Sequence, residues 1–251
     1  MKPVSAKDLI QLDGKMKVTK LQGYMIPEQV IWQAAKNDYS EIAIEDAKTP
    51  LPDDCGKWVV EELLANERGH WGPLEHPQIT FSCTGFVHSV IVQARTHRIG
   101  TTWDVQSQRY TGKRVMKVAS GELKPEEVFY IRPPGYYTNR KGKKYEWTPE
   151  HYNEKLQTCL ILAHQYAMDC KDLGLSEEHA RDYLPQAIRQ NFVVSFNLRS
   201  MLHFMDLRAK LDAQLEIQAL CELFAPELEA WVPNVWKYYE NKRLHKARLS
   251  P

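Results

Sequence analysis

The sequence predicts an α+β fold, in which helices pack around an antiparallel sheet. Residues 78–84 alternate between apolar and polar side chains, which is typical of a strand with one buried face. Residues 192–196 form a short apolar run, which we interpret as another strand. From residue 149 onward the apolar side chains recur mostly at helical spacing, so the helices are expected to be grouped around the sheet.

Two helices are expected before the first strand. Apolar side chains at helical spacing predict one helix over 27–35 and a second over 58–66, which Gly69 can end. Between Gly69 and the strand, two prolines indicate a loop that carries three polar side chains, His70, Glu75 and His76.

The period changes directly after the first strand. Apolar residues from Phe86 onward fall at helical spacing, which predicts a helix over 86–99, and Gly100 can supply the left-handed residue that ends it. In such a helix Gln93 and His97 lie on one face, four residues apart.

The later patterns predict, in order, strands at 109–118 and 128–132, a mobile loop at 135–144, and an amphipathic helix at 150–173. Ser176 is placed to cap the helix that follows. After the 192–196 strand, Asn197 is expected to cap one long helix that runs through Arg208 towards Leu223.

A length of 251 residues allows one large domain or two small ones, and 43% of the residues are hydrophobic and available for a core. We expect a single domain over residues 1–251. The charge is nearly balanced, with 33 Lys and Arg against 32 Asp and Glu, which argues against a general nucleic-acid binder. The five cysteines form no CxxC pair, so reduced thiols in a cytoplasmic protein are the simple interpretation. The sequence shows no apolar run long enough for a membrane span, and we expect no membrane partner.

A cationic window between residues 93 and 109 is the strongest functional signal. It holds a glutamine, three arginines, a histidine and a serine, namely Gln93, Arg95, His97, Arg98, Ser107 and Arg109. The planar guanidinium group binds phosphates and carboxylates with two hydrogen bonds at once. The window therefore indicates a small-anion or nucleobase site, and the alternative is a solvated basic helix end.

A second polar cluster lies on the helix that follows Asn197. Arg199 and His203 share one face of this helix, whereas Arg208, nine residues after Arg199, falls on about the opposite face. The helix also has several apolar side chains to bury, so at least one arginine should be buried or at an interface. The structural alternative makes both arginines surface partners of Asp206 and Asp212.

Other catalytic motifs are weak or missing. The sequence has no G-x-G-x-x-G after a strand, no P-loop and no H-E-x-x-H. His70 and His76 are poorly spaced for a metal site, and no cysteine lies in a cationic setting that would activate it. Ser107 could be a nucleophile, but a role in anion binding is more economical.

Five motifs in order resemble the flavin-dependent thymidylate synthase family over about residues 34–217. They are Gly69-His70 with Pro73-x-Glu75-His76, Gln93-x-Arg95-x-His97-Arg98 with Ser107-x-Arg109-Tyr110, Ala180-Arg181 with Leu184-Pro185, Asn197-x-Arg199-Ser200 through Arg208, and Ala213-Gln214-x-Glu216-Ile217. The resemblance implies the family's α+β fold and a homotetramer whose active sites are shared between subunits. It also implies conversion of dUMP to dTMP with FAD, methylenetetrahydrofolate and NADPH.

The same resemblance assigns residues to ligands. The FAD contacts it implies are Glu75, His97, Arg98, Ile99, Asn197, Arg199 and His203. The dUMP contacts it implies are Gln93, Arg95, Gln106, Ser107, Gln108, Arg109, Arg181 and Arg208. Of these, Arg208 would lie at the uracil edge and stabilise the negative charge that builds there. A nucleophilic cysteine is not needed if reduced flavin supplies the hydride.

The chain departs from the family's pattern at several positions. Thr96 interrupts the usual Arg-His-Arg, which leaves open whether Arg95 or Thr96 takes the position of the displaced arginine. Asp104-Val105 replaces a common Asn-Glu pair, and Asp212 replaces a frequent histidine. Two rival functions remain, a non-catalytic nucleotide- or flavin-binding module of the same fold and an RNA-binding protein.

Overall fold

The computed structural model describes residues 2–65, 68–139 and 141–246, which form two compact units. Unit 1 comprises Met1–Lys17, Cys83–Thr96 and Asp104–Phe192, and unit 2 comprises Val18–Ser82, His97–Trp103 and Val193–Pro251. Each unit is assembled from three segments of chain, so neither is a continuous stretch of sequence. That all of 1–251 behaves as a single domain stays a prediction.

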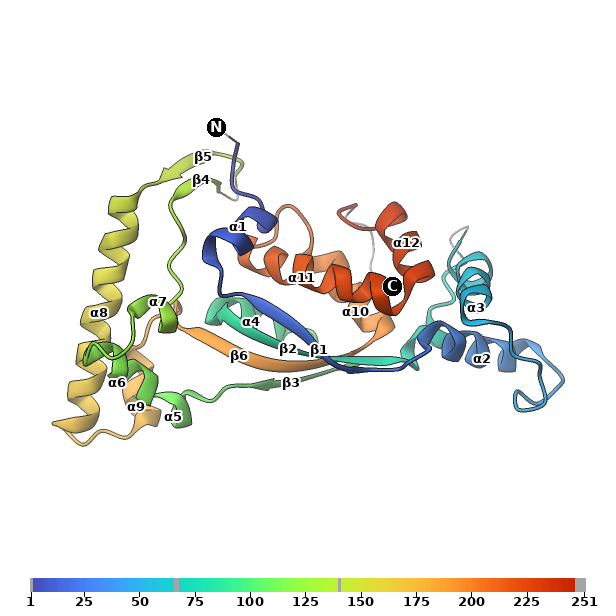
Figure 1. Cartoon of the computed structure of the whole chain (residues 1–251), viewed down its shortest axis with the longest axis horizontal. Coiled ribbons are helices and arrows are strands. Elements are labelled where there is room, and N and C mark those ends of the chain that lie inside the picture. Colours follow the sequence, from blue (N-terminus) through green and yellow to red (C-terminus); the bar gives the residue numbers. More distant parts are fainter. Residues whose placement is uncertain (1, 66–67, 140, 247–251) are drawn as a thin grey trace. The chain divides into compact units, whose positions relative to one another are not determined.

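A four-stranded sheet has the strand order β1-β2-β6-β3 (Figure 1). The strands are β1 Lys17–Gly23, β2 Gln78–Val87, β3 Thr101–Val105 and β6 Arg189–Asn197. The Thr80 and Ser195 hydroxyls are 2.8 Å apart in unit 2, and Gly85 N donates to Asn191 Oδ1 at 3.0 Å in unit 1. Residue numbers therefore rise along β2 as they fall along β6, so these two strands are antiparallel. The predicted antiparallel sheet within an α+β fold is confirmed.

Strand β2 continues three residues beyond the predicted end, and helix α4 covers only His88–Ala94. Gly85 has φ +78°, and a Cβ there would lie 2.3 Å from Lys15 O, so this glycine permits a close backbone approach inside the strand rather than ending it. The predicted helix over 86–99 is therefore wrong at both ends, and Gln93 and His97 do not share a helical face.

The chain after residue 100 contains a strand that the sequence did not indicate. Gly100 has φ +63° and leads directly into β3, while its carbonyl accepts a hydrogen bond from Asn197 N at 2.9 Å. A Cβ on Gly100 would lie 2.3 Å from Asn197 Nδ2 and from Ser200 Oγ. This glycine therefore serves a close approach within unit 2, not the end of a helix.

Unit 1 is mostly helical where strands were expected. Its elements are α1 Ala6–Asp13, α4, α5 Gln108–Thr111, α6 Lys113–Ala119, α7 Pro125–Val128, the β4 Gly135–Thr138 and β5 Lys144–Trp147 hairpin, α8 Pro149–Lys171, α9 Glu177–Ala180 and the 3-10 turn η4 Arg181–Tyr183. The strand predicted at 109–118 is wrong because Val115 and Val118, three residues apart, both bury against α8 in one cluster. The mobile loop predicted at 135–144 is a paired hairpin, with residue 140 outside the described residues.

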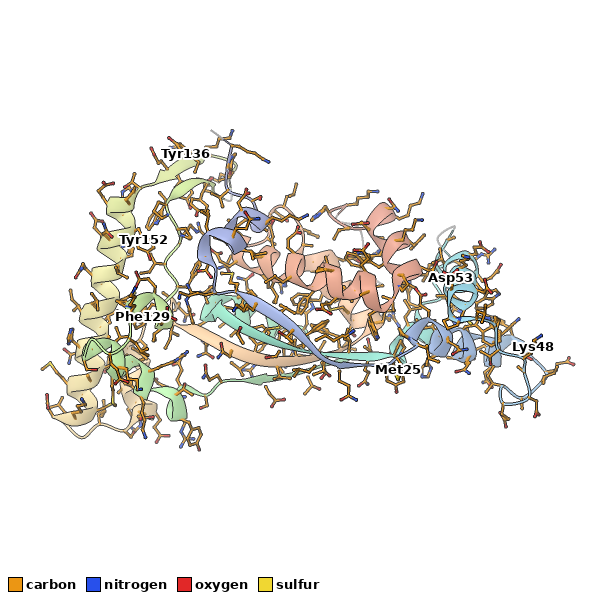
Figure 2. All side chains as sticks on the ribbon, in the orientation of Figure 1. Met25, Lys48, Asp53, Phe129, Tyr136 and Tyr152 are labelled. Atoms are coloured by element: carbon orange, nitrogen blue, oxygen red, sulfur yellow. The ribbon has the colours of Figure 1, made fainter. Side chains whose placement is uncertain are left out.

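The segment predicted as a strand at 128–132 makes only one isolated antiparallel bridge, between Phe129 and Ile188. Phe129 is fully buried, and Tyr152 of α8 packs at the edge of the same cluster (Figure 2). The amphipathic helix predicted at 150–173 is confirmed as α8, whose N-terminus is capped by Thr148.

A buried ion pair joins the two ends of unit 1. Arg189 donates from Nη2 to Asp13 Oδ1 at 2.6 Å and from Nη1 to Asp13 Oδ2 at 3.1 Å. The same guanidinium group donates to Gly85 O at 2.7 Å and to Glu126 O at 3.0 Å. The two side chains are only 5% and 2% exposed, so each charge depends on the other for compensation.

Unit 2 contains α2 Pro27–Tyr39, α3 Pro52–Val59, the π-helical turn η1 Val60–Leu64, the 3-10 helix η3 Gly72–Glu75, α10 Leu198–Arg208, α11 Leu215–Trp231 and α12 Pro233–Lys242. The first helix runs longer than predicted. The second begins six residues before the predicted start, and the predicted end, Asn66, lies outside the described residues. The long helix expected after Asn197 is two helices, because the chain turns between Arg208 and Leu215.

Two contacts fix helices within unit 2. The buried Glu28 carboxylate accepts hydrogen bonds from Asn234 N at 2.8 Å and Val235 N at 2.9 Å, which caps the start of α12, and burial raises the pKa of this carboxyl group. Phe81 of β2, Phe196 of β6, Phe204 of α10 and Phe224 of α11 pack in one aromatic cluster. Within the described residues, none of the helices combines the length and apolar character needed to cross a bilayer.

Candidate functional site

The C-terminal end of α10 places Arg208 against a buried histidine. Arg208 Nε donates a hydrogen bond to His97 Nε2 at 3.0 Å, and His97 is 8% exposed. A guanidinium group can only donate, so His97 Nε2 must accept, which makes the imidazole neutral with its proton on Nδ1. Burial first, and then the neighbouring Arg208 and His203, lower the pKa of His97 to about 4.

We expect His97 to make the stability of the protein depend on pH. The unfolded chain protonates this histidine near pH 6.5, whereas the folded chain does so only near pH 4. The free energy of unfolding should therefore be fully retained above pH 6.5 and fall as the pH is lowered towards 4, by about 3 kcal/mol at most. Urea unfolding at pH 7.5, 6 and 5 measures this slope.

His97→Gln is the matched variant for this test, because its amide oxygen can still accept from Arg208 but does not titrate. The slope between pH 7.5 and 5 should be smaller in His97→Gln than in the original chain. Equal slopes would show that other groups cause the loss.

The His97 ring and backbone are held by aromatic and hydroxyl neighbours. The ring packs edge-on against Phe204 at 4.9 Å and against His203 at 5.3 Å between centroids. His97 O accepts hydrogen bonds from Trp103 Nε1 at 3.2 Å and from Thr101 Oγ1 at 2.8 Å. These contacts fix the plane of the imidazole and therefore the position of the Arg208 guanidinium group.

The N-terminal end of α10 carries the second arginine. The Asn197 side chain accepts a hydrogen bond from Ser200 N at 2.8 Å, so the predicted N-cap is confirmed. Arg199 Nη1 lies 2.6 Å from Glu75 Oε1 at the end of η3. Arg199 and Arg208 thus contact different parts of unit 2, as expected for side chains on opposed helical faces.

Asp206, near the C-terminal end of α10, bonds neither of these arginines. It accepts from Tyr239 Oη at 2.8 Å and from Arg243 Nη2 at 2.6 Å, and it is 6% exposed. The structural alternative that paired Asp206 with Arg199 or Arg208 on the surface is therefore wrong. The Asp206 contacts instead tie α10 to α12 and to the residue that follows it.

Two further candidate FAD residues lie on the surface of unit 2. Arg98 is exposed, and Ile99 is 86% exposed, which is unusual for a large apolar side chain. The motif residues His70, Pro73 and His76 line a separate cavity of about 450 Å³. His70 Nδ1 lies 2.9 Å from Tyr39 Oη. Within the described parts of the chain, no group of three or more His, Cys, Asp or Glu could hold a metal ion.

In unit 1, two of the predicted nucleotide-binding arginines meet at one residue. Arg109 Nε lies 3.0 Å from Glu178 Oε2, and Arg181 Nε donates to Glu178 O at 3.1 Å. Arg109 belongs to α5, Glu178 to α9 and Arg181 to the turn that follows α9. Glu178 is not among the predicted site residues, because nothing local in the sequence shows that its carboxylate reaches Arg109.

The other candidate nucleotide-binding residues of unit 1 lie on α4 or near the start of α5. Gln93 is in α4, while Arg95 is the exposed residue at its C-terminal end. Ser107 precedes α5 and is exposed, and Gln108 is the first residue of that helix. Gln106 Oε1 is buried, and none of the described residues donates a hydrogen bond to it. A buried acceptor without a donor is costly unless a ligand or water supplies one.

The two sets of predicted residues belong to different units. All seven candidate FAD residues are in unit 2, and all the candidate dUMP residues except Arg208 are in unit 1. The sequence motifs interleave along the chain, so this division was not visible in the sequence.

The profile of the family described as thymidylate synthase complementing protein matches residues 20–234. Flavin-dependent thymidylate synthases of Halobacterium salinarum and Haloarcula marismortui are 32% and 31% identical, each over 94% of this chain and 100% of its own length.

Solved structures show the same fold. Thymidylate synthase X of Helicobacter pylori, solved with FAD and dUMP, gives a TM-score of 0.67 at 16% identity over 90% of this chain and 98% of its own. The UMP/dUMP methylase PolB of Streptomyces cacaoi, solved with 5-Br dUMP, gives a TM-score of 0.70 at 18% identity over 94% of this chain and 97% of its own. The family profile and the full-length relatives together show that this chain belongs to the flavin-dependent thymidylate synthase family of enzymes.

Proposed function

We propose that this protein converts dUMP to dTMP by reductive methylation, with FAD as cofactor, methylenetetrahydrofolate as carbon donor and NADPH as reductant. The observation that carries the proposal is the contact between Arg208 and the neutral, buried His97. The neutral imidazole accepts this hydrogen bond without adding a negative charge of its own, and it holds the guanidinium group in place. The arginine can therefore stabilise negative charge on a bound ligand.

The mechanism assigns Arg208 to the uracil edge. Addition of hydride at uracil C6 would push negative charge onto C5 and O4, which makes C5 nucleophilic, and a guanidinium group fixed at that edge would stabilise this charge without moving a proton. Bound FAD would supply the hydride after reduction. No protein nucleophile is then required, in keeping with the burial that raises the pKa of Cys55 and Cys159 to about 11.

We infer that the unit 2 set holds FAD. These residues are Glu75, His97, Arg98, Ile99, Asn197, Arg199 and His203, and they include hydrogen-bonding, cationic and apolar groups suited to a flavin with a diphosphate. The 86% exposure of Ile99 supports a role in which a ligand or a second subunit covers it. A homotetramer with shared sites is part of the proposal, and light scattering on the purified protein tests it.

We infer that the unit 1 set, which is Gln93, Arg95, Gln106, Ser107, Gln108, Arg109 and Arg181, binds dUMP. Arg109 and Arg181 meet at Glu178, which supports a phosphate site there. The buried Gln106 oxygen supports a further contact with a ligand donor.

We expect Arg95, rather than Thr96, to replace the displaced arginine of the family signature. The Thr96 hydroxyl already donates to Gln93 O at 2.7 Å at the end of α4, while the Arg95 side chain is exposed. Arg95→Ala should weaken dUMP binding by about 10-fold, as loss of a charge-assisted contact does, and Thr96→Ala should change it less than about 2-fold. Calorimetric titration of both variants with dUMP measures this, and the reverse order would assign the position to Thr96.

Tritium release from dUMP labelled at C5 tests the function itself. Purified protein is assayed with FAD, NADPH and methylenetetrahydrofolate, and each is omitted in turn. Release that needs all three supports the proposed reaction. Protein that carries flavin and binds dUMP but releases no tritium would instead support the non-catalytic binding module, and strong RNA binding without dUMP binding would support the RNA-binding alternative.

A further inference from the structure

Glu178 holds two arginines of unit 1 through different atoms. Its carboxylate contacts Arg109 Nε at 3.0 Å, and its backbone carbonyl accepts from Arg181 Nε at 3.1 Å. From this geometry we infer that Glu178 is a positioning residue for the phosphate of the nucleotide, although it does not touch the nucleotide itself. This inference rests on the proposed binding of dUMP to unit 1.

Glu178 contacts only the Nε atoms of Arg109 and Arg181. A guanidinium group presents donors along two edges, and both contacts to Glu178 use Nε. Among the described residues, neither Arg109 nor Arg181 has a further hydrogen bond from its terminal nitrogens. Two guanidinium groups anchored at Nε thus keep their terminal nitrogens for one anion, and a phosphate accepts such paired donors.

Glu178 could also weaken the site, because its negative charge opposes an incoming phosphate. The Arg109 and Glu178 side chains are 52% and 41% exposed, so water and salt screen this repulsion. Screening does not remove the entropic penalty of ordering Arg109, the long and flexible side chain that the carboxylate holds, when the nucleotide binds. Positioning should therefore outweigh repulsion, and removal of the carboxylate should weaken binding.

The neighbouring carboxylate offers a matched control. Glu177 precedes Glu178 in the first turn of α9, and within the described chain it has no hydrogen bond or ion pair with Arg109 or Arg181. Glu177→Gln removes the same charge from the same turn without removing the contact. A change found in Glu178→Ala but absent in Glu177→Gln thus reports the contact rather than net charge.

Dissociation constants for dUMP and for deoxyuridine are measured on the FAD-loaded protein. Glu178→Ala should weaken dUMP binding by about 3- to 10-fold and raise its KM with kcat retained. Glu178→Gln should lose less, because its amide oxygen keeps a polar contact with Arg109 after the charge is removed. Deoxyuridine, which lacks the phosphate, should bind all variants equally, and Glu177→Gln should match the original chain.

Several results would overturn the inference. Unchanged or tighter dUMP binding in Glu178→Ala would show that the carboxylate is passive or competes with phosphate. Equal weakening for dUMP and deoxyuridine would show a general structural role. In either case dUMP binding by the original chain leaves the proposed function standing, whereas an original chain that does not bind dUMP removes both.

Discussion

Arg208→Ala is expected to slow tritium release from C5-labelled dUMP by about 10²- to 10³-fold, which corresponds to about 3–4 kcal/mol of transition-state stabilisation. The guanidinium group is fixed by its 3.0 Å hydrogen bond to His97, so it needs no reorganisation as charge develops. The loss should appear in kcat more than in KM for dUMP, because the charge that Arg208 stabilises develops only during reaction. Steady-state and single-turnover assays at saturating FAD measure it.

Lys210→Ala is the control for this variant, since it removes a nearby cation that lies just beyond α10. It should retain nearly full activity. If Arg208→Ala also retained near-full dTMP formation, Arg208 would not be the polarising group.

The largest loss of stability is expected from Asp13→Asn. This change leaves the Arg189 guanidinium group, 5% exposed, without its anionic partner, and unpaired buried charges cost about 3–5 kcal/mol. Arg189 also donates to the carbonyls of Gly85 and Glu126, so the loss should loosen several segments of unit 1 together. Urea unfolding followed by circular dichroism should show the transition at lower urea.

Glu127→Gln provides the comparison within the same unit. Glu127 pairs with Lys15, but these side chains are 49% and 32% exposed, and such exposed pairs contribute about 0–1 kcal/mol. A similar loss in both variants would mean that burial does not set the importance of the Asp13–Arg189 pair.

Elements that satisfy one local rule were predictable from the sequence. The Asn197 cap, the start of α10 and most of α8 follow from a side-chain cap or from helical periodicity, and all appear in the structure. Helices α5 and α6 did not follow, because a short segment such as Val115 to Val118, with a β-branched valine at each end, is compatible with both a strand and a helix. Packing against α8, which the local sequence does not encode, decides between them.

In the candidate site, too, only the features set by local sequence were predictable. Spacing along α10 placed Arg199 and Arg208 on opposed faces, which needs only helical geometry. Their partners were not predictable, because His97 lies 111 residues before Arg208 and Glu75 lies 124 residues before Arg199. The motif resemblance grouped residues by ligand, yet only the fold separated them into two units and revealed Glu178 between Arg109 and Arg181.

The distance in sequence between Asp13 and Arg189 has a consequence for biosynthesis. The two residues are 176 positions apart, so a ribosome working at about 5–20 residues per second needs about 10–35 s after Asp13 to add its partner. During that interval α1 lacks the ion pair that anchors it in the finished protein. Unit 1 therefore completes its packing late in translation or after release, and nascent chains should be open to chaperones and proteases until Arg189 has left the exit tunnel.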